Sequence, residues 1–188
     1  TDAVRAVVAE SWQPPSYEAE EIEEGFVHPA QVMRPLNTVL GAHHHVVVGG
    51  GGFWTFPGAF LNALGPEGYN FEADFMAIGQ AYSMAMGAAV ADGRRSVIAI
   101  EGDGSAMLNL QELDAVADGG IPVMLIVIND GGYGGEVHGL AGLGMDGSIA
   151  RFKRADFPAL ARAFGVEGVR LESSGQIVDL VREFDRTR

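Results

Sequence analysis

The sequence contains no cysteine in its 188 residues. Disulfides, thiolate metal sites and cysteine nucleophiles are therefore excluded. Basic residues are also scarce, because 12 Lys and Arg stand against 25 Asp and Glu and give a formal net charge of −13 at pH 7. Such an acidic surface repels DNA, RNA and anionic lipid, so we expect neither nucleic acid nor membrane as a partner.

Long hydrophobic runs are missing too. The longest apolar stretch, residues 76–91, is interrupted by Gln80, Ser83 and two glycines. It falls short of the roughly 18 apolar residues that a membrane-spanning helix needs. No signal peptide is visible, and together with the lack of cysteine this predicts a cytoplasmic protein. Because the chain begins with Thr1 instead of Met, we expect a piece of a longer protein or a processed one.

Glycine, in contrast, is abundant and clusters in loops between apolar segments. The chain has 27 glycines, about twice the usual share of roughly 7%. Strand-like and helix-like segments alternate, which predicts an α/β fold: a three-layer, doubly wound, mostly parallel sheet with helices on both faces. The expected strands are residues 45–48, 96–100, 122–128 and 166–171. The expected helices are 29–40, 57–64, 74–91 (or a loop there that leads into a helix), 108–117, 156–164 and a last one after the capping pair Ser173 and Gln176.

The domain boundary is expected near residue 29. Residues 1–28 are rich in Glu and should be a linker or the tail of an upstream region. Residues 29–188 then form a single domain. Within it, the Gly-rich residues 137–148 are expected to be a mobile loop.

Two acidic loops follow two of the apolar strands. Asp103 lies in the segment Glu-Gly-Asp-Gly-Ser after strand 96–100, and Asp130 lies in Asn-Asp-Gly-Gly-Tyr-Gly-Gly after strand 122–128. The carboxyl ends of parallel strands share one edge of a sheet, where ligands bind. Carboxylate oxygens suit Mg²⁺, and glycines let backbone amides approach phosphate oxygens. The sequence thus predicts Mg²⁺ holding a diphosphate; the alternative is two ordinary loop aspartates beside glycines.

These two segments resemble the thiamine-diphosphate motif of the acetolactate synthase and benzoylformate decarboxylase superfamily. The resemblance implies a thiamine-diphosphate-binding fold, with residues 29–188 as the C-terminal, diphosphate-binding domain. It also implies thiamine diphosphate and Mg²⁺ as cofactors. Asp130 stands where the family usually has Asn, which adds a negative charge beside an anionic cofactor. The implied metal ligands are Asp103, Asp130 and the carbonyl of Gly132, and the implied diphosphate contacts are Gly104, Ser105, Tyr133 and Gly134.

Two further segments extend the resemblance. Residues 48–54 are similar to the family's first phosphate loop, in which Gly51 replaces the usual His, so Gly51 and Gly52 would offer the cofactor backbone amides only. Residues 76–79 and 85–89 are similar to the segment that shapes the cofactor. By this resemblance Ile78 is the wedge that bends thiamine diphosphate, and the Met76 carbonyl accepts a hydrogen bond from its aminopyrimidine. The alternative for Ile78 is plain core packing.

The activating residue of the family has no counterpart here. In the family, a Glu on a pyrimidine-binding domain of the partner subunit promotes deprotonation of the thiazolium. No Glu of this chain has a matching context, so we expect no catalytic residue in it and no activity from it alone. The missing domain would come from another chain or from upstream sequence, and we expect a homo-oligomer, a dimer or a tetramer.

The resemblance implies an enzyme that breaks or forms a C–C bond beside the carbonyl of a 2-oxo acid. One alternative is the cofactor subunit of a two-subunit 2-oxo acid decarboxylase of the sulfopyruvate or phosphonopyruvate type. Another is a binding domain without catalysis, either a Rossmann-like nucleotide binder or an inactive regulator. Against the Rossmann reading, no Gly-x-Gly-x-x-Gly joins a strand to a helix with an acidic residue some 20 positions on.

Several polar side chains are left without an assigned role. His43, His44 and His45 are adjacent, and neighbours on a strand point to opposite faces, so all three cannot face one metal. We expect them to be a loop that enters a strand. His138 and Glu136 either face the substrate or lie on the surface, and Glu101 is expected to have a supporting or structural role.

Overall fold

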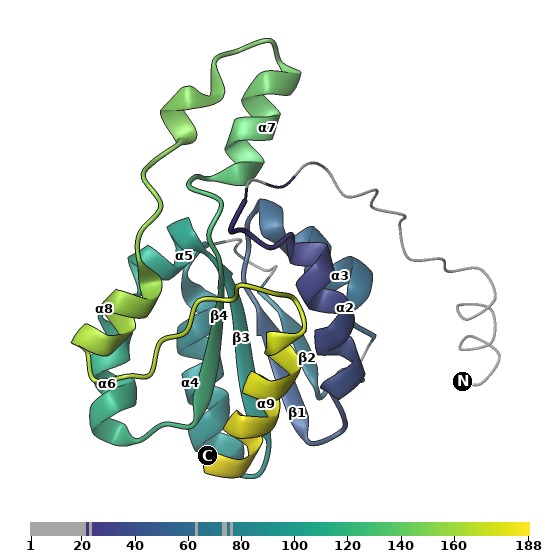
Figure 1. The fold of residues 1–188 in the computed structure, drawn as a ribbon, viewed down its shortest axis with the longest axis vertical. Coiled ribbons are helices and arrows are strands. Elements are labelled where there is room, and N and C mark those ends of the chain that lie inside the picture. The colour runs from purple at the N-terminus through teal and green to yellow at the C-terminus, as the bar shows by residue number, and fades with distance from the viewer. Residues whose placement is uncertain (1–21, 23, 63, 73–74, 76) are drawn as a thin grey trace, which may run out of the picture.

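A computed structural model describes residues 22, 24–62, 64–72, 75 and 77–188 of the chain (Figure 1). Within them a four-stranded sheet has the order β2-β1-β3-β4, and every neighbouring pair is parallel. The strands are β1 (His44–Val48), β2 (Tyr69–Phe71), β3 (Ser96–Gly102) and β4 (Val123–Ile128).

Helices cover both faces of this sheet, which confirms the predicted three-layer, doubly wound architecture (Figure 1). The alternation of side chains along a strand explains the two layers. Val46 and Val48 of β1 face one core, whereas Val47 faces the other. The first core is completed by α2 (Pro29–Val39), α3 (Thr55–Phe60) and α9 (Gln176–Thr187), and the second by α4 (Gln80–Asp92) and α6 (Glu112–Gly119).

Helix ends follow the expected sequence signals. α2 begins at Pro29, whose fixed φ suits a first turn, and it runs through Pro35. α4 ends at Gly93 in the left-handed conformation. α8 (Phe157–Ala163) is capped by the Asp156 carboxylate, which accepts a 3.0 Å hydrogen bond from the Ala159 amide. Before α9, the Gln176 side chain accepts from the amide of Ser173 at 3.0 Å, which is the glutamine half of the expected capping box.

Two sequence predictions are wrong. Residues 166–171 form no strand; Val166 and Leu171 instead pack against the two cores, which accounts for the apolar pattern. Residues 137–148 are not a loop, because α7 (Gly134–Gly142) and the 3-10 helix η2 (Gly147–Ala150) occupy most of them. The buried Val137 anchors α7, and Gly147 lies so close that a Cβ there would be 2.9 Å from the Val137 carbonyl oxygen.

The structure also contains elements that the sequence did not predict. β2 has only three residues, too few for a period of two to be recognised. The 3-10 helix η1 (Gly52–Trp54) occupies the loop after β1, and the helix expected at 57–64 is α3. The helix expected at 108–117 is split into α5 (Asp103–Leu108) and α6, so the first acidic segment itself opens a helix. Most of the expected linker, residues 1–28, lies outside the described residues.

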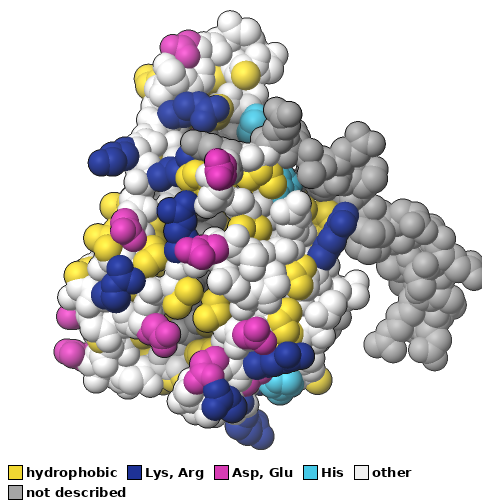
Figure 2. Space-filling view, in the orientation of Figure 1, with side chains coloured by type: hydrophobic (Ala, Val, Ile, Leu, Met, Phe, Trp, Pro, Cys, Tyr) yellow, Lys and Arg dark blue, Asp and Glu magenta, His cyan; other side chains and the backbone are white. Residues whose placement is uncertain are grey.

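The surface shown in Figure 2 carries basic and acidic side chains interspersed, without a continuous basic stripe on that face. Among the described helices none has the length and apolar character needed to cross a bilayer.

Candidate functional site

The carboxyl ends of β3 and β4 lie side by side. The strands are parallel, and Gly102 of β3 is in register with Ile128 of β4. Asp103 follows the first strand directly and Asp130 follows the second after one residue. The sheet therefore brings both aspartates to one edge, as the sequence predicted. At this end α7 and η2 project beyond the sheet (Figure 1).

Asp103 is a buried carboxylate at the start of α5, and its side chain is 1% exposed. Its Oδ1 atom accepts a 2.8 Å hydrogen bond from the Gly104 amide, and its Oδ2 atom accepts one of 2.8 Å from the Gly131 amide. Gly131 presents that amide from the left-handed region, with φ 78°, which glycine adopts without strain. The second acidic loop is thus fastened to the first aspartate.

Asp130 is exposed, whereas the neighbouring Asp103 is buried. Burial is the largest cause of the raised pKa of Asp103, and the neighbouring Asp130 raises that pKa further by its charge and by direct hydrogen-bond contact. Hydrogen bonds from the amides of Gly131 and Gly104 oppose this rise. Two carboxylates in contact repel each other, and a cation between them would relieve this repulsion. The donor set therefore fits a hard divalent cation.

The loop between Asp130 and α7 is held by a short antiparallel contact with the segment after η2. Gly132 pairs with Arg151. The Tyr133 amide donates to the Ala150 carbonyl at 2.9 Å, and the Phe152 amide donates to the Gly131 carbonyl at 3.0 Å. These bonds fix the backbone of 131–133, and Gly132 lines the same cleft as the two aspartates.

Glycines allow the loops around the aspartates to pack closely. A Cβ at Gly104 would lie 2.5 Å from Cε1 of Tyr133, and a Cβ at Gly52 would lie 2.8 Å from the Gly135 amide nitrogen. The loop after β1 therefore touches the first turn of α7, and the Tyr133 ring covers the start of α5. The Ser105 hydroxyl closes the third side by donating to the Gly50 carbonyl at 3.3 Å.

Together these loops enclose a cleft that brings together every predicted site residue that the structure describes. Met76 lies outside the described residues, so its role stays a prediction. The lining residues predicted from the sequence are Gly51, Gly52, Ile78, Asp103, Gly104, Ser105, Asp130, Gly132, Tyr133 and Gly134.

Three other residues in or beside the cleft were missed or left open by sequence reasoning. Phe53 is buried and lines the cleft, and its ring explains Gly102, where a Cβ would lie 2.9 Å from Cδ1 of Phe53. No sequence signal separated this ring from ordinary core. Glu136 lines the same cleft from α7. His138 instead lines an adjoining cavity of about 180 Å³, together with Asp130, Arg151 and others.

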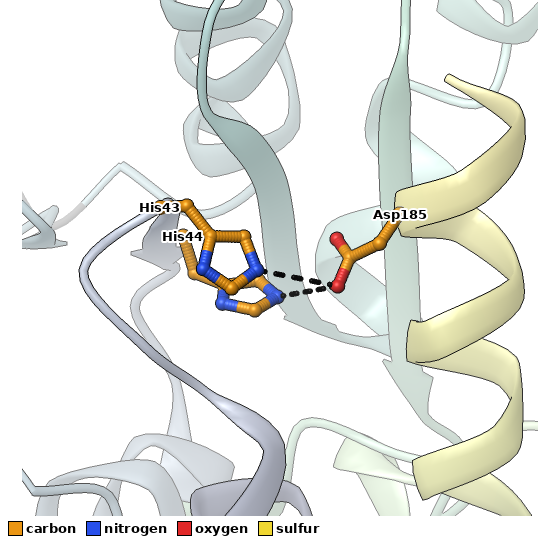
Figure 3. Close-up of side chains that lie close together, drawn as sticks. All are labelled: His43, His44 and Asp185. Atoms are coloured by element: carbon orange, nitrogen blue, oxygen red, sulfur yellow. Dashed lines mark hydrogen bonds and ion pairs between the residues drawn. The ribbon is translucent and has the colours of Figure 1, made fainter.

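A second cluster lies at the opposite end of the sheet, where His43 and His44 both point toward Asp185 of α9 (Figure 3). Their Nε2 atoms lie 3.4 and 3.3 Å from the Asp185 Oδ2 atom. His45 points elsewhere and contacts Asn70 at 2.6 Å, so the three histidines do not converge, as expected. His43 and His44 nevertheless converge on Asp185, because His43 lies in the turn before β1 and is not bound by the alternation of a strand.

The geometry of this cluster favours a contact between the His44 N–H and the Asp185 carboxylate over a metal site. The His44 Nδ1 atom accepts a 2.9 Å hydrogen bond from the Gly41 amide. In a neutral imidazole the other nitrogen then carries the proton, so His44 Nε2 faces Asp185 as an N–H and has no lone pair for a metal. Burial is the main cause of the lowered pKa of His44, which keeps the ring neutral.

Comparisons with known proteins agree with this picture. The family model described as "Thiamine pyrophosphate enzyme, C-terminal TPP binding domain" matches residues 46–187. A putative acetolactate synthase large subunit of Mycobacterium tuberculosis is 30% identical over 149 residues, which are 78% of this chain and 27% of that protein. An acetolactate synthase large subunit of Parasynechococcus marenigrum is 36% identical over 111 residues, which are 57% of this chain and 18% of that protein.

A solved structure supports the fold. It is the thiamine diphosphate-dependent 4-hydroxybenzoylformate decarboxylase of Rhodococcus jostii RHA1, with a TM-score of 0.77 and 22% identity over 98% of this chain and 37% of that chain. This chain thus spans between about a fifth and two fifths of these proteins. Because the family model covers most of the chain, the protein belongs to the family of C-terminal TPP-binding domains of thiamine pyrophosphate enzymes.

Proposed function

We propose that the chain forms the diphosphate- and metal-binding half of the cofactor site in an acetolactate-synthase-like enzyme. The main support is the contact between the buried Asp103 and the exposed Asp130 at the end of the sheet. Mg²⁺ prefers a few carboxylate and carbonyl oxygens together with phosphate oxygens and water. Asp103, Asp130 and the Gly132 carbonyl would hold the ion, and the ion would hold the diphosphate.

The backbone around the pair suits a diphosphate. Gly51 and Gly52 leave the loop after β1 without side chains that would fill the cleft, so amides can approach phosphate oxygens. Gly134 begins α7 at the cleft wall, where the partial positive charge of a helix N-terminus favours an anion. Gly104, Ser105 and Tyr133 complete the cradle. Because Gly51 carries no side chain, this loop would bind through its backbone alone.

The remaining cofactor contacts concern the organic part. Ile78 is half-buried and lines the same cleft as Asp130 and Gly134, which supports its role as the wedge that bends the cofactor. The Met76 carbonyl would accept the hydrogen bond from the aminopyrimidine. Bound thiamine diphosphate would supply a carbanion and an electron sink; this chain would bind and orient it.

The whole enzyme would act on a 2-oxo acid, breaking or forming the C–C bond beside its carbonyl as a transferase or a lyase. Relatives named acetolactate synthase and a structural neighbour named as a decarboxylase support this class. A pyrimidine-binding domain, from another chain or from upstream sequence, would contribute the activating Glu and join this domain in a homo-oligomer. Without it the chain would bind cofactor weakly and show no turnover.

The metal part of the proposal is testable on this chain alone. Mn²⁺ replaces Mg²⁺ at oxygen sites and enhances water-proton relaxation when bound. We expect an enhancement that grows when thiamine diphosphate is added and disappears in Asp103→Asn. The matched control is Asp146→Asn, an exposed aspartate that caps η2, which should behave as the wild type. Equal enhancement in the wild type and Asp103→Asn would refute the metal assignment.

The dependence on a second domain is tested separately. Calorimetry of the chain with thiamine diphosphate and Mg²⁺ should give weak binding, and adding a pyrimidine-binding domain should strengthen it. 2-Oxo acid decarboxylation should appear only in the combined protein. Turnover by the chain alone would overturn the half-site proposal, and tight cofactor binding without turnover in the combined protein would favour a non-catalytic domain.

A further inference from the structure

Glu101 is a carboxylate that the proposed cofactor site does not use, although it lies two residues before Asp103. It belongs to β3, and its side chain is 0% exposed. A buried carboxylate costs free energy unless hydrogen bonds and charge partners compensate it. The charge of another buried carboxylate, Glu72 after β2, also acts unfavourably on Glu101. An apolar residue would fill this position at a lower cost in free energy, which indicates that the contacts of the Glu101 carboxylate have a role.

The first contact joins Glu101 to the start of α4. Its Oε1 atom accepts a 3.2 Å hydrogen bond from the Tyr82 amide, and the neighbouring Ala81 amide also lowers the pKa of Glu101. Amides in the first turn of a helix have no partner within the helix. Glu101 supplies that partner from a distant strand and thereby fixes the first turn of α4. Ile78, which lines the cleft, lies just before this turn.

The second contact joins Glu101 to the loop after β1. A Cβ at Gly49 would lie only 2.2 Å from the Glu101 Oε2 atom, so the carboxyl group occupies the space that a side chain would take. Gly49 leads directly to Gly51 and Gly52 in the cleft wall. The third neighbour is the Ser105 side chain, which lowers the pKa of Glu101, although its hydroxyl donates to the Gly50 carbonyl. Ser105 belongs to the helix that Asp103 begins. One carboxyl group therefore touches the base of each of these three segments.

We propose that Glu101 is a positioning residue, which holds the loop after β1, the first turn of α4 and the start of α5 at fixed separations so that the cofactor cleft is formed before ligand binds. The inference rests on the proposed function for what the cleft binds, and on the contacts of Glu101 for how the cleft is held. Glu101 is not among the residues that line the cleft, so it acts through the segments that it contacts and not on the cofactor.

Amide hydrogen exchange by mass spectrometry on the full chain without cofactor tests the inference. In Glu101→Gln, which keeps the size but replaces one oxygen by an NH₂ donor, we expect faster exchange in residues 49–53 and 77–83. Glu101→Met, which loses both acceptors, should show a larger increase in the same two segments. The matched control is Val97→Ala in the same strand, buried in the core shared with α4; it should destabilise the sheet without a selective effect on these segments.

Cofactor affinity provides the second readout. Loss of a residue that orients a binding group typically weakens binding by about tenfold or more, so thiamine diphosphate at saturating Mg²⁺ should bind Glu101→Met about tenfold more weakly, with Glu101→Gln between it and the wild type. Exchange that rises uniformly in all variants, or affinity lost equally in Val97→Ala, would overturn the positioning role. If the wild type binds no thiamine diphosphate, the proposed function fails, while the exchange pattern still decides whether Glu101 holds the three segments.

Discussion

The Oδ2 atom of Asp103 accepts a 2.8 Å hydrogen bond from the Gly131 amide, which ties the first turn of α5 to the loop that follows β4. The amide points at the carboxylate because Gly131 adopts φ 78°. This contact also orders the second aspartate, since Asp130 is the preceding residue. The geometry of the candidate metal site therefore depends on one left-handed glycine. Three other close contacts are equally open to substitution: Asp103 with Asp130, Gly104 with Tyr133, and His44 with Asp185.

Gly131→Ala should damage both stability and metal binding. A residue with a side chain is strained at this φ by about 1–3 kcal/mol, and its Cβ would lie 3.1 Å from both the Arg154 Cγ atom and the Phe152 carbonyl oxygen. We expect the free energy of unfolding in urea to fall by about this amount, and the Mn²⁺ relaxation enhancement to weaken. Gly87→Ala is the control, because Gly87 lies in α4 with nothing near its Cβ position; it should raise stability by roughly 0.5–1 kcal/mol. A Gly131→Ala variant as stable as the wild type would contradict the strain.

Asp130→Asn should separate the charge of the second ligand from its oxygen. Asp130 raises the pKa of Asp103, after burial, by its charge and by contact. The amide keeps an oxygen for the metal and removes one carboxylate from the repelling pair, so the chain without metal should become more stable. Free Mn²⁺ should bind more weakly, because one negative charge is lost. Thiamine diphosphate at saturating Mg²⁺ should bind at least as tightly as to the wild type, since less negative charge faces the diphosphate.

The matched comparison for Asp130→Asn is Asp103→Asn, which should lose both the binding of Mn²⁺ and the metal-dependent binding of thiamine diphosphate. Calorimetry with and without EDTA measures each step. If Asp130→Asn and Asp103→Asn lose cofactor binding equally, the two aspartates have the same role and the assigned asymmetry is wrong.

Gly104→Ala should disturb the cleft more than the fold. Its Cβ would lie 2.5 Å from Cε1 of Tyr133 and 3.4 Å from Cζ of Phe152. The Tyr133 side chain is 37% exposed and has room to turn away, and alanine in a helix is more favourable than glycine by about 1 kcal/mol. We therefore expect the free energy of unfolding to change by less than about 1 kcal/mol. Cofactor affinity should fall by about tenfold, because the ring leaves the cleft wall.

The double variant Gly104→Ala with Tyr133→Ala should bind about as weakly as Gly104→Ala alone, because the ring has already left the cleft wall in the single variant. Calorimetry on the four proteins of this cycle measures the coupling. Independent, additive effects of the two substitutions would mean that the ring and the glycine do not contact each other.

The sequence was most informative where side-chain chemistry follows a buried strand. Asp103 and Asp130 could be placed together because a parallel pair of strands brings both strand ends to one edge, and the register of β3 and β4 agrees. It was least informative where an apolar pattern has several explanations. Leu171 and Val137 are both apolar residues in segments that contain glycines, yet the first packs without a strand and the second anchors a helix. Packing against other elements decided both, and local sequence does not encode it.

Phe53 and Glu101 show the same limit within the site. From the sequence, the Phe53 ring cannot be told apart from an ordinary core side chain. Only its closeness to Gly102 reveals that it forms part of the cleft wall. Glu101 is adjacent to the acidic segment, but its partners Gly49 and Tyr82 are 52 and 19 positions away in the chain. Such contacts are long-range and carry no periodic signal.

The cluster of His44, Asp185 and Ser96 predicts loss of stability in acid. Burial lowers the pKa of His44 from 6.5 despite the nearby Asp185 charge. Burial alone would raise the pKa of Asp185, but the Ser96 hydroxyl and the two histidines outweigh it, and the net pKa lies below 3.8. For both groups the unfolded chain binds protons more readily than the folded one, so stability is present at neutral pH and is lost as pH falls. The loss through His44 begins near pH 6.5, and that through Asp185 follows near pH 4.

His44→Asn removes the first of these titrations while retaining an acceptor for the Gly41 amide. Between pH 7 and pH 5 the His44 titration should lower the free energy of urea unfolding of the wild type, by at most about 1.4 kcal/mol per pH unit for one proton. Glu101, whose pKa burial raises to about 7, acts in the opposite direction over the same interval. The His44 contribution is therefore the difference in slope between the wild type and His44→Asn. His44→Asn should be less stable than the wild type at pH 7, because the contact with Asp185 is weakened, but its stability should fall less over this interval. His138→Asn, an exposed histidine at the other end of the molecule, should keep the slope of the wild type. An unchanged slope in His44→Asn would show that another group controls acid unfolding.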